Sequence, residues 1–369
     1  MYRKIWRHFD FLLLGATLLL ILYGIAMIHS AIAGSPGLVE LPKRQAIYAA
    51  VGLVFMLALS LMDYHVLLEF RTLIYLLTVG LLVLVLVLGQ ATHGAQRWLD
   101  VKLFPVQPSE LAKVLLTVTL AAHFATHQDE IKRFRVFVLS FLYVLPPIVL
   151  ILLEPNLSAS LSLAVLWLAI VFVAGVRWRY LIGVGAVGVL ASPLAWLFMA
   201  DYQRDRLLTF LNPSHNPDVR YNVEHALISI GSGGWFGKGF ALGSQSQLRF
   251  LRVRWSDFIF AVIGEELGMV GILVLFALLL IVIFRIFRNA EVSRDLFGRL
   301  IAAGVGTLIL FQAMTNIGAN VGLLPVTGVP LPFVSSGGSS LITLLIAEGL
   351  VQSVSLRRQK IEFQLASRI

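Results

Sequence analysis

The sequence predicts an all-α polytopic membrane protein with about ten transmembrane helices. The chain has 369 residues, of which 58% are apolar and only 13% are charged. A soluble protein of this size carries about a quarter charged residues. Several uncharged apolar runs of roughly 18 to 25 residues are long enough to cross a hydrocarbon core of about 30 Å. These runs are continuous rather than alternating, which excludes a β-barrel.

The apolar segments are expected to cross the membrane within one integral membrane domain that covers residues 1–369. The first has a basic flank like that of a signal peptide, but it is long and further spans follow, so we interpret it as a retained anchor. The fourth begins near Pro108 and Ser109 and the eighth near Ser256 and Asp257, residue types that favour helix starts. The expected spans are residues 11–31, 45–62, 71–89, 109–125, 135–153, 157–175, 179–200, 257–285, 299–321 and 337–356.

Lysine and arginine predict the orientation of these spans. With the N-terminus in the cytoplasm, the segments on that side hold about 17 Lys and Arg residues, because basic residues favour the cytoplasmic side. The short segments on the other side hold about four, which are Lys43, Arg44, Arg97 and Lys102. We therefore expect both termini in the cytoplasm. The same asymmetry explains the net charge of +9 without a nucleic-acid partner, and the absence of cysteine excludes disulfides and thiol chemistry.

The largest segment outside the membrane is expected to be the extracytoplasmic loop 201–256, between the seventh and eighth spans. A loop of this length in a compact protein is usually functional or disordered. Its apolar patch, residues 223–230, is either a short re-entrant segment or an interfacial helix. No internal repeat of the kind found in many transporters is visible.

Asp257 is the first candidate for a functional residue, because it stands where the polar run from Ser244 enters the eighth span. Small side chains on its face would permit close packing or a cleft beneath the carboxylate. On a continuous helix, the residues that share this face are Ala261, Gly264, Gly268 and Gly271. Asp257 is therefore expected to be a helix N-cap, a functional carboxylate, or both.

Glu110 and Lys113 are the second candidates, in the sequence QPSELAK at the start of the fourth span. They are three residues apart, so they share a helix face and can pair. Charged residues in a membrane face a cavity or one another. The pair is expected either to fix helix packing or to line a polar cavity on the outer side.

Four further carboxylates have no partner that the sequence identifies. Glu154 lies in a short outer turn and is expected to be solvated. Glu265 should lie roughly 12 Å below Asp257 on a continuous helix, with Glu266 facing away. Glu348 lies mid-span, so it must be paired or face a cavity.

The outer loops also contain groups suited to an anionic substrate. Ser335 to Ser339 open the tenth span, and backbone N–H groups at a helix start can hold a phosphate; a rigid turn is the alternative. Arginine suits diphosphate because its guanidinium is a planar fork. The outer cations are Arg97, Arg204, Arg206, Lys238, Arg249, Arg252 and Arg254. Together they fit a lipid-linked phosphate better than a neutral solute. No metal-ligand motif such as HExxH is present.

Six motifs, in order between residues 94 and 356, give the chain a resemblance to a known family. They are GAQRWLD (94–100), QPSELAK (107–113), DYQRDR (201–206), GSQSQLRFL (243–251), SDFIFAVIGEELG (256–268) and PVTGVPLPFVSSGGSS (325–340). They resemble the SEDS family of shape, elongation, division and sporulation proteins, which includes RodA, FtsW and SpoVE. DYQRDR and the Gln-Ser-Gln-Leu run are nearer to RodA-type members than to FtsW-type members.

The resemblance implies a ten-span peptidoglycan glycosyltransferase of the bacterial inner membrane. Such enzymes polymerise lipid II at the extracytoplasmic face and release undecaprenyl diphosphate. The implied partners are a class B penicillin-binding protein, which is a transpeptidase, and other elongation machinery. Asp257 matches the family's essential aspartate, and Glu110 and Lys113 match its QPSE(L/I)AK motif. The remaining expected substrate contacts are Arg97, Gln107, Ser109, Arg206, Lys238, Ser335, Gly337 and Gly338.

The sequence departs from the family pattern at three places. Trp255 and Ser256 replace the usual His-Thr before the aspartate. Ser336 replaces a tyrosine, and Asn156 stands where an aspartate is common. Because Asp257, the Glu–Lys pair and the proline-rich loop are retained, we expect an active enzyme.

The expected chemistry is inverting transfer, with Asp257 as general base on the acceptor sugar hydroxyl. Lys113 and the loop arginines would neutralise the diphosphate that leaves. A divalent cation, Mg²⁺ or Mn²⁺, held through Asp257 is an alternative, although the sequence identifies no metal ligands or other cofactor. The alternative functions are a lipid II transporter (flippase) with Glu348, Glu265 and Lys113 along its path, a division-specific FtsW-type polymerase, and a non-catalytic scaffold.

Overall fold

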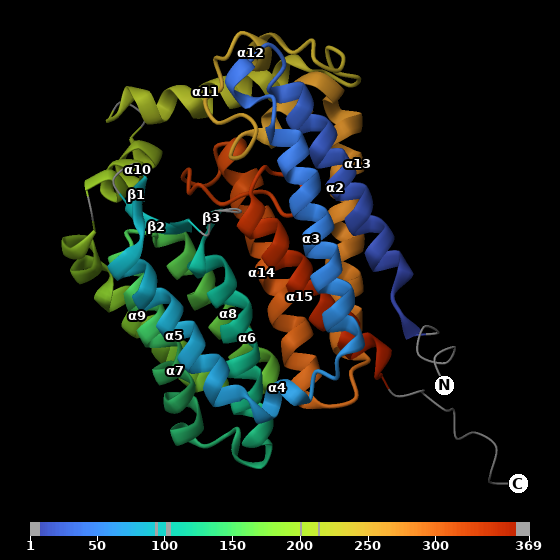
Figure 1. Ribbon diagram of the computed structural model, residues 1–369. Coiled ribbons are helices and arrows are strands. Elements are labelled where there is room, and N and C mark those ends of the chain that lie inside the picture. Colours follow the sequence, from blue (N-terminus) through green and yellow to red (C-terminus); the bar gives the residue numbers. More distant parts are fainter. Residues whose placement is uncertain (1–7, 93–94, 101–104, 200, 213–214, 359–369) are drawn as a thin grey trace, which may run out of the picture.

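The computed structural model describes residues 8–92, 95–100, 105–199, 201–212 and 215–358. The topology prediction also used residues outside these ranges. They are the N-terminal residues 1–7, the C-terminal residues 359–369, and Lys102. Each expected span corresponds to a helix (Figure 1). These helices are α2 (Phe11–Ala31), α3 (Leu41–Leu61), α5 (Arg71–Leu88), α6 (Pro108–Thr126), α7 (Phe134–Leu153), α8 (Leu157–Ala174), α9 (Trp178–Phe198), α13 (Ile259–Glu291), α14 (Leu296–Asn320) and α15 (Gly338–Leu356).

The prediction of a polytopic helical membrane protein is confirmed. Among the described residues, eight of these helices are long and apolar enough to cross a membrane; α6 and α9 complete the ten expected spans. Short helical turns connect the spans at η2 (Pro36–Leu38), α4 (Val66–Glu69) and η3 (Gln128–Glu130). The first and last spans end together, because the Asp10 N–H donates to Gln352 Oε1 (3.0 Å) and the Ser355 hydroxyl donates to the His8 carbonyl (3.0 Å). This proximity is what an even number of spans requires.

A small antiparallel sheet between α5 and α6 was not predicted. Its strands are β1 (Gln90–Thr92), β2 (Ala95–Asp100) and β3 (Pro105–Val106), in the order β1-β2-β3. Thr92 pairs with Ala95, and Leu99 with Val106. The strands are too short to give an alternating pattern that can be recognised in sequence. Strand β2 matters for the site because it carries Arg97 and Trp98.

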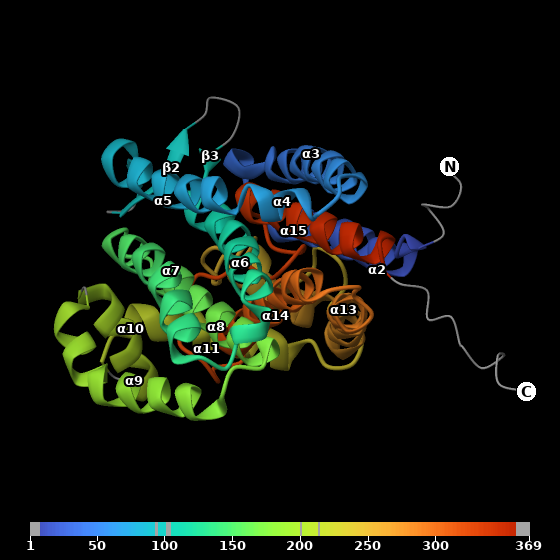
Figure 2. The same ribbon diagram turned by 90° about the horizontal axis from the view of Figure 1, so that it is seen from below.

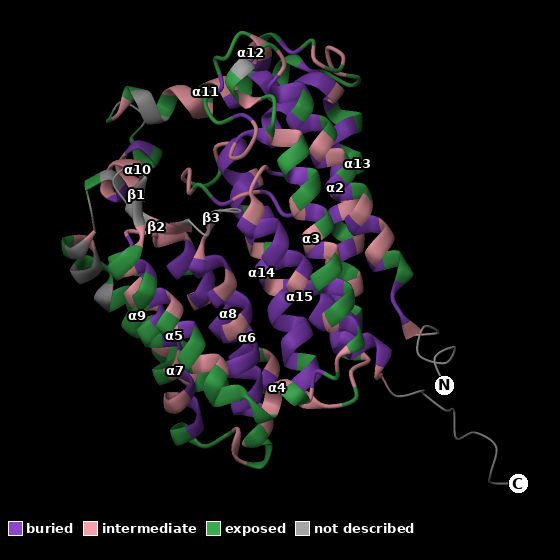
Figure 3. Ribbon diagram, in the orientation of Figure 1, coloured by how far each residue is buried: buried purple, intermediate pink, exposed green. Residues whose placement is uncertain are grey.

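Helices α14 and α15 form the centre of the bundle. They lie between α2, α3 and α13 on one side and α5 to α9 on the other (Figure 2), and both are largely buried (Figure 3). Some of their buried polar groups have partners on neighbouring helices, whereas Oε1 of Gln312 and Oε1 of Glu348 have none among the described residues. Glu348 of α15 accepts from the Thr17 hydroxyl (2.8 Å), so this mid-span carboxyl is paired, as the sequence required. Asp10 caps α2 and pairs with Arg285 of α13 (2.9 Å).

Helix α13 differs from the single span expected over 257–285, because the chain reverses direction at Gly268. The backbone of Gly268 is non-helical there (φ 64°, ψ −160°). Phe260 and Phe276 stack with ring centroids 6.0 Å apart, whereas 16 residues of continuous helix would separate them by about 24 Å. Residues 259–267 therefore form a short limb that packs antiparallel to the longer limb, residues 269–291.

The reversal also corrects the stripe of small residues expected beneath Asp257. Gly264 does not open a cleft: its backbone packs against Gly233 of the outer loop. Gly268 packs against the backbone of Trp235 and Gly237. The outer loop therefore packs against Gly264 and Gly268, and these glycines do not form a cavity below the carboxylate.

The outer loop 201–256 contains three helices, α10 (Asp201–Leu211), α11 (Pro217–Ser232) and α12 (Ser244–Gln247). The apolar patch 223–230 belongs to α11, which lies across the end of the bundle (Figure 1). This placement fits the interfacial helix better than the re-entrant segment.

We predict that Gly268→Ala destabilises the protein. The observed φ and ψ are essentially restricted to glycine and cost other residues about 1–3 kcal/mol, and the added methyl would press on the Gly237 backbone. The melting temperature in detergent should fall for Gly268→Ala and should stay level or rise for Gly80→Ala, whose new Cβ in α5 meets open space and whose helical backbone favours alanine. Equal melting temperatures for the two variants would contradict the reversal at Gly268.

Candidate functional site

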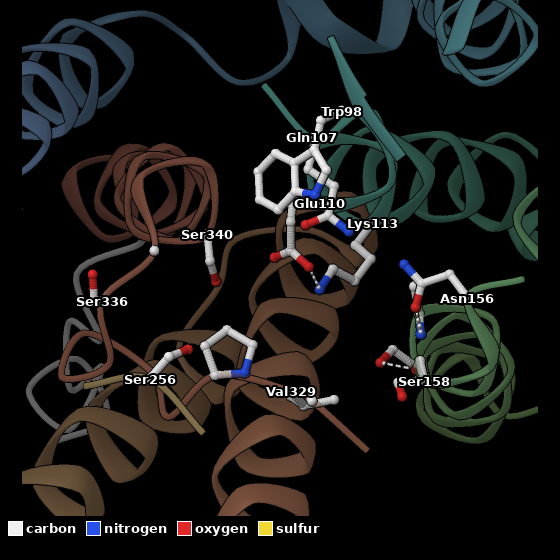
Figure 4. Close-up of a pocket in the computed structure, with 15 residues that line it drawn as sticks. Trp98, Gln107, Glu110, Lys113, Asn156, Ser158, Ser256, Val329, Ser336 and Ser340 are labelled. Atoms are coloured by element: carbon white, nitrogen blue, oxygen red, sulfur yellow. Dashed lines mark hydrogen bonds and ion pairs between the residues drawn. The ribbon is translucent and has the colours of Figure 1, made fainter. Parts of the chain in front are cut away.

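A cavity of about 160 Å³ lies where β2, α6 and α8 meet the segments that precede α13 and α15 (Figure 4). Most of the residues that line it have polar or charged side chains. The lining residues are Trp98, Gln107, Glu110, Lys113, Asn156, Ser158, Ala159, Ser162, Ser256, Gly328, Val329, Pro330, Ser336, Gly337 and Ser340. Figure 4 places Glu110 and Lys113 between Ser256, Ser336 and Ser340 on one side and Asn156 and Ser158 on the other.

Glu110 and Lys113 form an ion pair inside this cavity. Lys113 Nζ donates to Glu110 Oε1 (2.7 Å), and both side chains are buried. Pro108 at the start of α6 sets the helical register, and Glu110 in the first turn is favoured by the positive end of the helix dipole. The pair lies within α6 and so does not itself join two helices, whereas both residues line the cavity, as the second sequence-based alternative expected.

Gln107 and Ser109, beside that pair, differ in their exposure to the cavity. Gln107 lines it, and its backbone N–H donates to Ser339 Oγ (3.0 Å). The hydroxyl of Ser109 is fully buried without a hydrogen-bond partner in the described chain, and this residue is not part of the cavity wall.

Asp257 stands at the rim of the cavity. Its Oδ1 accepts from the Ser256 hydroxyl (3.1 Å), and a Cβ placed on Gly328 of the cavity wall would lie 3.8 Å from its Oδ2. The expected capping role is wrong, because Phe258 is the N-cap residue of α13. Burial raises the pKa of the Asp257 carboxyl, while the Ser256 hydrogen bond and the positive charge of Arg206 act in the opposite direction.

Two asparagines that sequence analysis missed hold the backbone of Asp257. Its carbonyl oxygen accepts from the side-chain amides of Asn316 (3.1 Å) and Asn320 (2.8 Å), both on α14. The Asn316 amide also donates to the carbonyl of Val329 in the cavity wall (2.9 Å). Two asparagines four residues apart share a helix face, and in an apolar span this pattern is a signal that could have identified them.

The segment before α15, residues 335–337, was expected to hold an anion. Its hydrogen bonds instead support the backbone that precedes Asp257. The Ser335 hydroxyl donates to the Ser256 carbonyl (2.6 Å), and the Ser336 N–H donates to the Trp255 carbonyl (3.0 Å). The Gly337 N–H donates to Gln45 Oε1 (3.2 Å), so this group is already used. Of the expected contacts in this segment, Gly337 lines the cavity, whereas Ser335 and Gly338 do not.

A second, smaller cavity of about 50 Å³ holds the expected arginines. Arg97 and Arg206 both line it, together with Gln203 and Thr327. Arg97 Nε donates to the Glu154 carbonyl (2.9 Å), and another of its nitrogens donates to the Pro155 carbonyl. Asn156 and Ser158 line both cavities, so the two are neighbours. Asn156 also caps α8 by accepting from the Ala159 N–H (3.3 Å).

Lys238 lies away from both cavities, in contact with the short limb of α13. Its ammonium pairs with Glu265 Oε1 (2.9 Å) and donates to Ser244 Oγ (2.8 Å). Glu265 also accepts the N–H groups of Gln245 (2.8 Å) and Ser246 (3.0 Å). Glu265 therefore fixes α12 against α13, which sequence analysis could not assign.

The transport path suggested by Glu348, Glu265 and Lys113 is not supported. Glu348 bonds to Thr17 within the bundle, Glu265 holds the outer loop, and Lys113 pairs with Glu110 in the cavity. The three side chains therefore make contacts in three different parts of the structure and do not line one path. Within the described ranges, no three His, Asp or Glu side chains come together as a metal site.

Glu154 was expected to be solvated, and this is wrong. Its side chain is 1% exposed, and neither carboxylate oxygen has a hydrogen-bond partner among the described residues. Burial raises the pKa of this carboxyl to about 8, although the charge of Arg97 opposes the shift.

Comparisons with known proteins relate the whole chain to one family. The family model FTSW_RODA_SPOVE, described as "Cell cycle protein", matches residues 10–360. The peptidoglycan glycosyltransferase MrdB of Escherichia coli K12 is 38% identical over 355 residues, which are 95% of each chain. The probable peptidoglycan glycosyltransferase FtsW of Geobacter sulfurreducens is 36% identical over 362 residues, covering 95% of this chain and 96% of the relative.

Solved structures agree with the sequence comparisons. A chain from a structure described as the structural coordination of polymerisation and crosslinking by a peptidoglycan synthase complex superposes with a TM-score of 0.82. It is 31% identical, covering 94% of this chain and 97% of that one. The rod shape determining protein RodA of Thermus thermophilus superposes with a TM-score of 0.72 at 30% identity, covering 95% of this chain and 98% of that one.

We predict that wild type loses stability as the pH rises from about 5 to about 8, and that Glu154→Gln does not show this loss. The unfolded carboxyl ionises near pH 4.3, whereas the folded carboxyl keeps its proton until about pH 8. The folded state binds more protons in this window, so the free energy of unfolding falls as pH rises and levels off above the folded pKa. The melting temperature of Glu154→Gln should exceed that of wild type by a margin that grows across the window. A constant margin would contradict a buried, protonated Glu154.

Proposed function

The chain belongs to the FTSW_RODA_SPOVE family of cell cycle proteins, and on this basis we propose that it polymerises lipid II into glycan strands at the extracytoplasmic face of the membrane. It is a multi-pass inner-membrane protein and a peptidoglycan glycosyltransferase, as are its relatives by name. The observation that carries the proposal is the position of the Asp257 carboxylate. It lies at the rim of a polar cavity, and the neighbouring cavity is lined by two arginines.

Asp257 acts as the general base in this proposal. Its carboxylate accepts the proton of an acceptor sugar hydroxyl while the hydroxyl oxygen forms a bond to the donor's anomeric carbon. The bond from that carbon to the diphosphate oxygen breaks, and undecaprenyl diphosphate leaves with the electron pair. Inversion needs one base when the leaving group is good, which fits one carboxylate better than a glycosidase pair. The raised pKa supports the role, because it makes the carboxylate a better proton acceptor.

The cations divide into two groups in this reaction. Lys113 is already neutralised by Glu110, so the pair presents a dipole to the sugar or the peptide more than a net positive charge. Arg97 and Arg206 line the neighbouring cavity, where their guanidinium groups would stabilise the charge that develops on the diphosphate. A divalent ion would add charge neutralisation near Asp257, and no step of the proposal depends on one.

We propose a role in elongation and cell shape, with a class B penicillin-binding protein as partner. The similarity to MrdB and to RodA of Thermus thermophilus supports an elongation role. The division-type alternative has support from the FtsW relatives at nearly the same identity. The synthase complex among the structural neighbours supports a transpeptidase partner. Depletion in cells separates the two roles, because loss of rod shape indicates elongation and filamentation indicates division.

We predict that Asp257→Asn abolishes polymerisation of purified lipid II. Loss of a general base typically costs about 10²- to 10⁴-fold in rate. The assay uses the full chain with its transpeptidase and counts glycan products by gel. The isosteric control Asp129→Asn, on an exposed side chain, should retain wild-type activity. Equal polymer from Asp257→Asn and wild type would remove Asp257 from the mechanism.

The pH profile of wild type gives an independent prediction. Because burial raises the pKa of Asp257, kcat/KM should fall as the pH drops through a value above the ordinary aspartate pKa of about 3.9. An acidic limb at or below that value would show that a buried Asp257 is not the base.

We predict that Asn320→Ala lowers kcat by about 10- to 100-fold with little change in KM, because small misplacements of a catalytic group are costly. The variant removes an amide that holds the Asp257 carbonyl. The acidic limb of the pH profile should stay in place. Thr307→Ala, which removes a hydroxyl bonded only within α14, is the matched control. A change confined to KM would show that Asn320 contacts substrate instead.

A further inference from the structure

A third cavity, of about 270 Å³, lies between α10, α11 and the loop that follows α14. It shares Arg206, Pro325 and Val326 with the cavity that holds Arg97. The three cavities therefore follow one another, from the Glu110–Lys113 pair, past the two arginines, to a space beside the outer helices. This last space plays no part in the proposed reaction as described so far.

The walls of the third cavity are apolar at its centre. Val223 and Leu227 lie on one face of α11, four residues apart, and both line the cavity. A Cβ placed on Gly322 would lie 3.7 Å from Val223 Cγ1 and 3.8 Å from Leu227 Cδ1, so these side chains face the loop after α14. Phe210 and Leu324 complete the apolar wall.

The charged and polar groups of this cavity come from α10 and α11. Arg220 pairs with Glu224, so these two cancel. Arg206 stands at the junction with the second cavity, and its positive charge acts on Asp257. Thr209, three residues further along α10, also lines the cavity, and its buried hydroxyl has no hydrogen-bond partner in the described chain. The space thus meets the second cavity at a cation, Arg206, and has an apolar wall on α11 that includes one ion pair, Arg220–Glu224.

We propose that the third cavity binds the first isoprene units of a polyprenyl diphosphate, with the diphosphate against Arg206 and Arg97. The order of the cavities supports this assignment, because an amphiphile with its head at the arginines has its chain in the adjoining apolar space. The substrate is the glycosyl donor, whose diphosphate must lie next to the reacting carbon and hence near Asp257. This inference rests on the proposed function and names the part of the protein that recognises the lipid.

Short soluble diphosphates test the cavity without requiring catalysis. Inorganic diphosphate, dimethylallyl diphosphate and geranyl diphosphate are titrated calorimetrically into the full-length protein in detergent. The second isoprene unit buries additional apolar carbon, so geranyl diphosphate should bind about tenfold more tightly than dimethylallyl diphosphate. Leu227→Trp fills the cavity and should abolish this gain. Ile228→Trp, the adjacent exposed residue outside the cavity, should retain it. Arg206→Gln should weaken all three ligands.

The outcomes separate the possible failures. Unchanged binding of inorganic diphosphate by Leu227→Trp shows that the variant is folded. A geranyl gain that survives in Leu227→Trp, or no gain in wild type, would overturn the proposal. Dihexanoyl phosphatidic acid is a further control. If it binds as tightly as geranyl diphosphate and Leu227→Trp weakens its binding, the proposal is overturned, because the cavity would then be a general lipid site. A wild-type protein that makes no polymer contradicts the proposed function, whereas the binding results still decide the cavity.

Discussion

The hydrogen bonds from two α14 asparagines to the carbonyl of Asp257 are the interaction on which the site depends. The chain around residue 257 is not helical, so its backbone groups need partners other than the usual helical ones. Asn316 and Asn320 supply them from one side, and Ser335 supplies one from the other through Ser256. The reversal at Gly268 makes this arrangement possible, because it turns the start of α13 inward against α14. A straight helix from residue 257 would carry the carboxylate away from the cavity.

Charge differs between the two neighbouring cavities of the site, so each cavity suits a different part of the substrate. The Glu110–Lys113 pair is internally neutral and buried, whereas the guanidinium groups of Arg97 and Arg206 line the neighbouring cavity. An uncharged sugar is suited to the first environment and a diphosphate to the second. Glu154 lies behind Arg97, and its raised pKa leaves it neutral at moderate pH. A neutral Glu154 does not compete with a substrate phosphate for the Arg97 guanidinium.

The sequence predicted the spans and their number, because these follow from hydrophobic length, and it singled out Asp257, which lies beside the cavity. It did not predict the reversal in α13, since Gly268 in an apolar run is compatible with a continuous helix. It placed Lys238 among the substrate contacts, although an ion pair with Glu265 across 27 positions holds it elsewhere. It missed Asn316 and Asn320, whose roles depend on a backbone carbonyl that no pattern identifies. Long-range contacts and non-helical backbone account for each of these differences.

Chemical rescue tests the central claim, that Asp257 is the proton acceptor, most directly. Asp257→Ala leaves a space at the cavity rim that formate can enter, and lipid II polymerisation is measured with increasing formate at constant ionic strength. The account predicts that formate restores activity in a concentration-dependent manner to Asp257→Ala and has no effect on wild type, with chloride inactive in both. A variant that binds lipid II and its transpeptidase normally, yet stays inactive at every formate concentration, would contradict a role for Asp257 as the base.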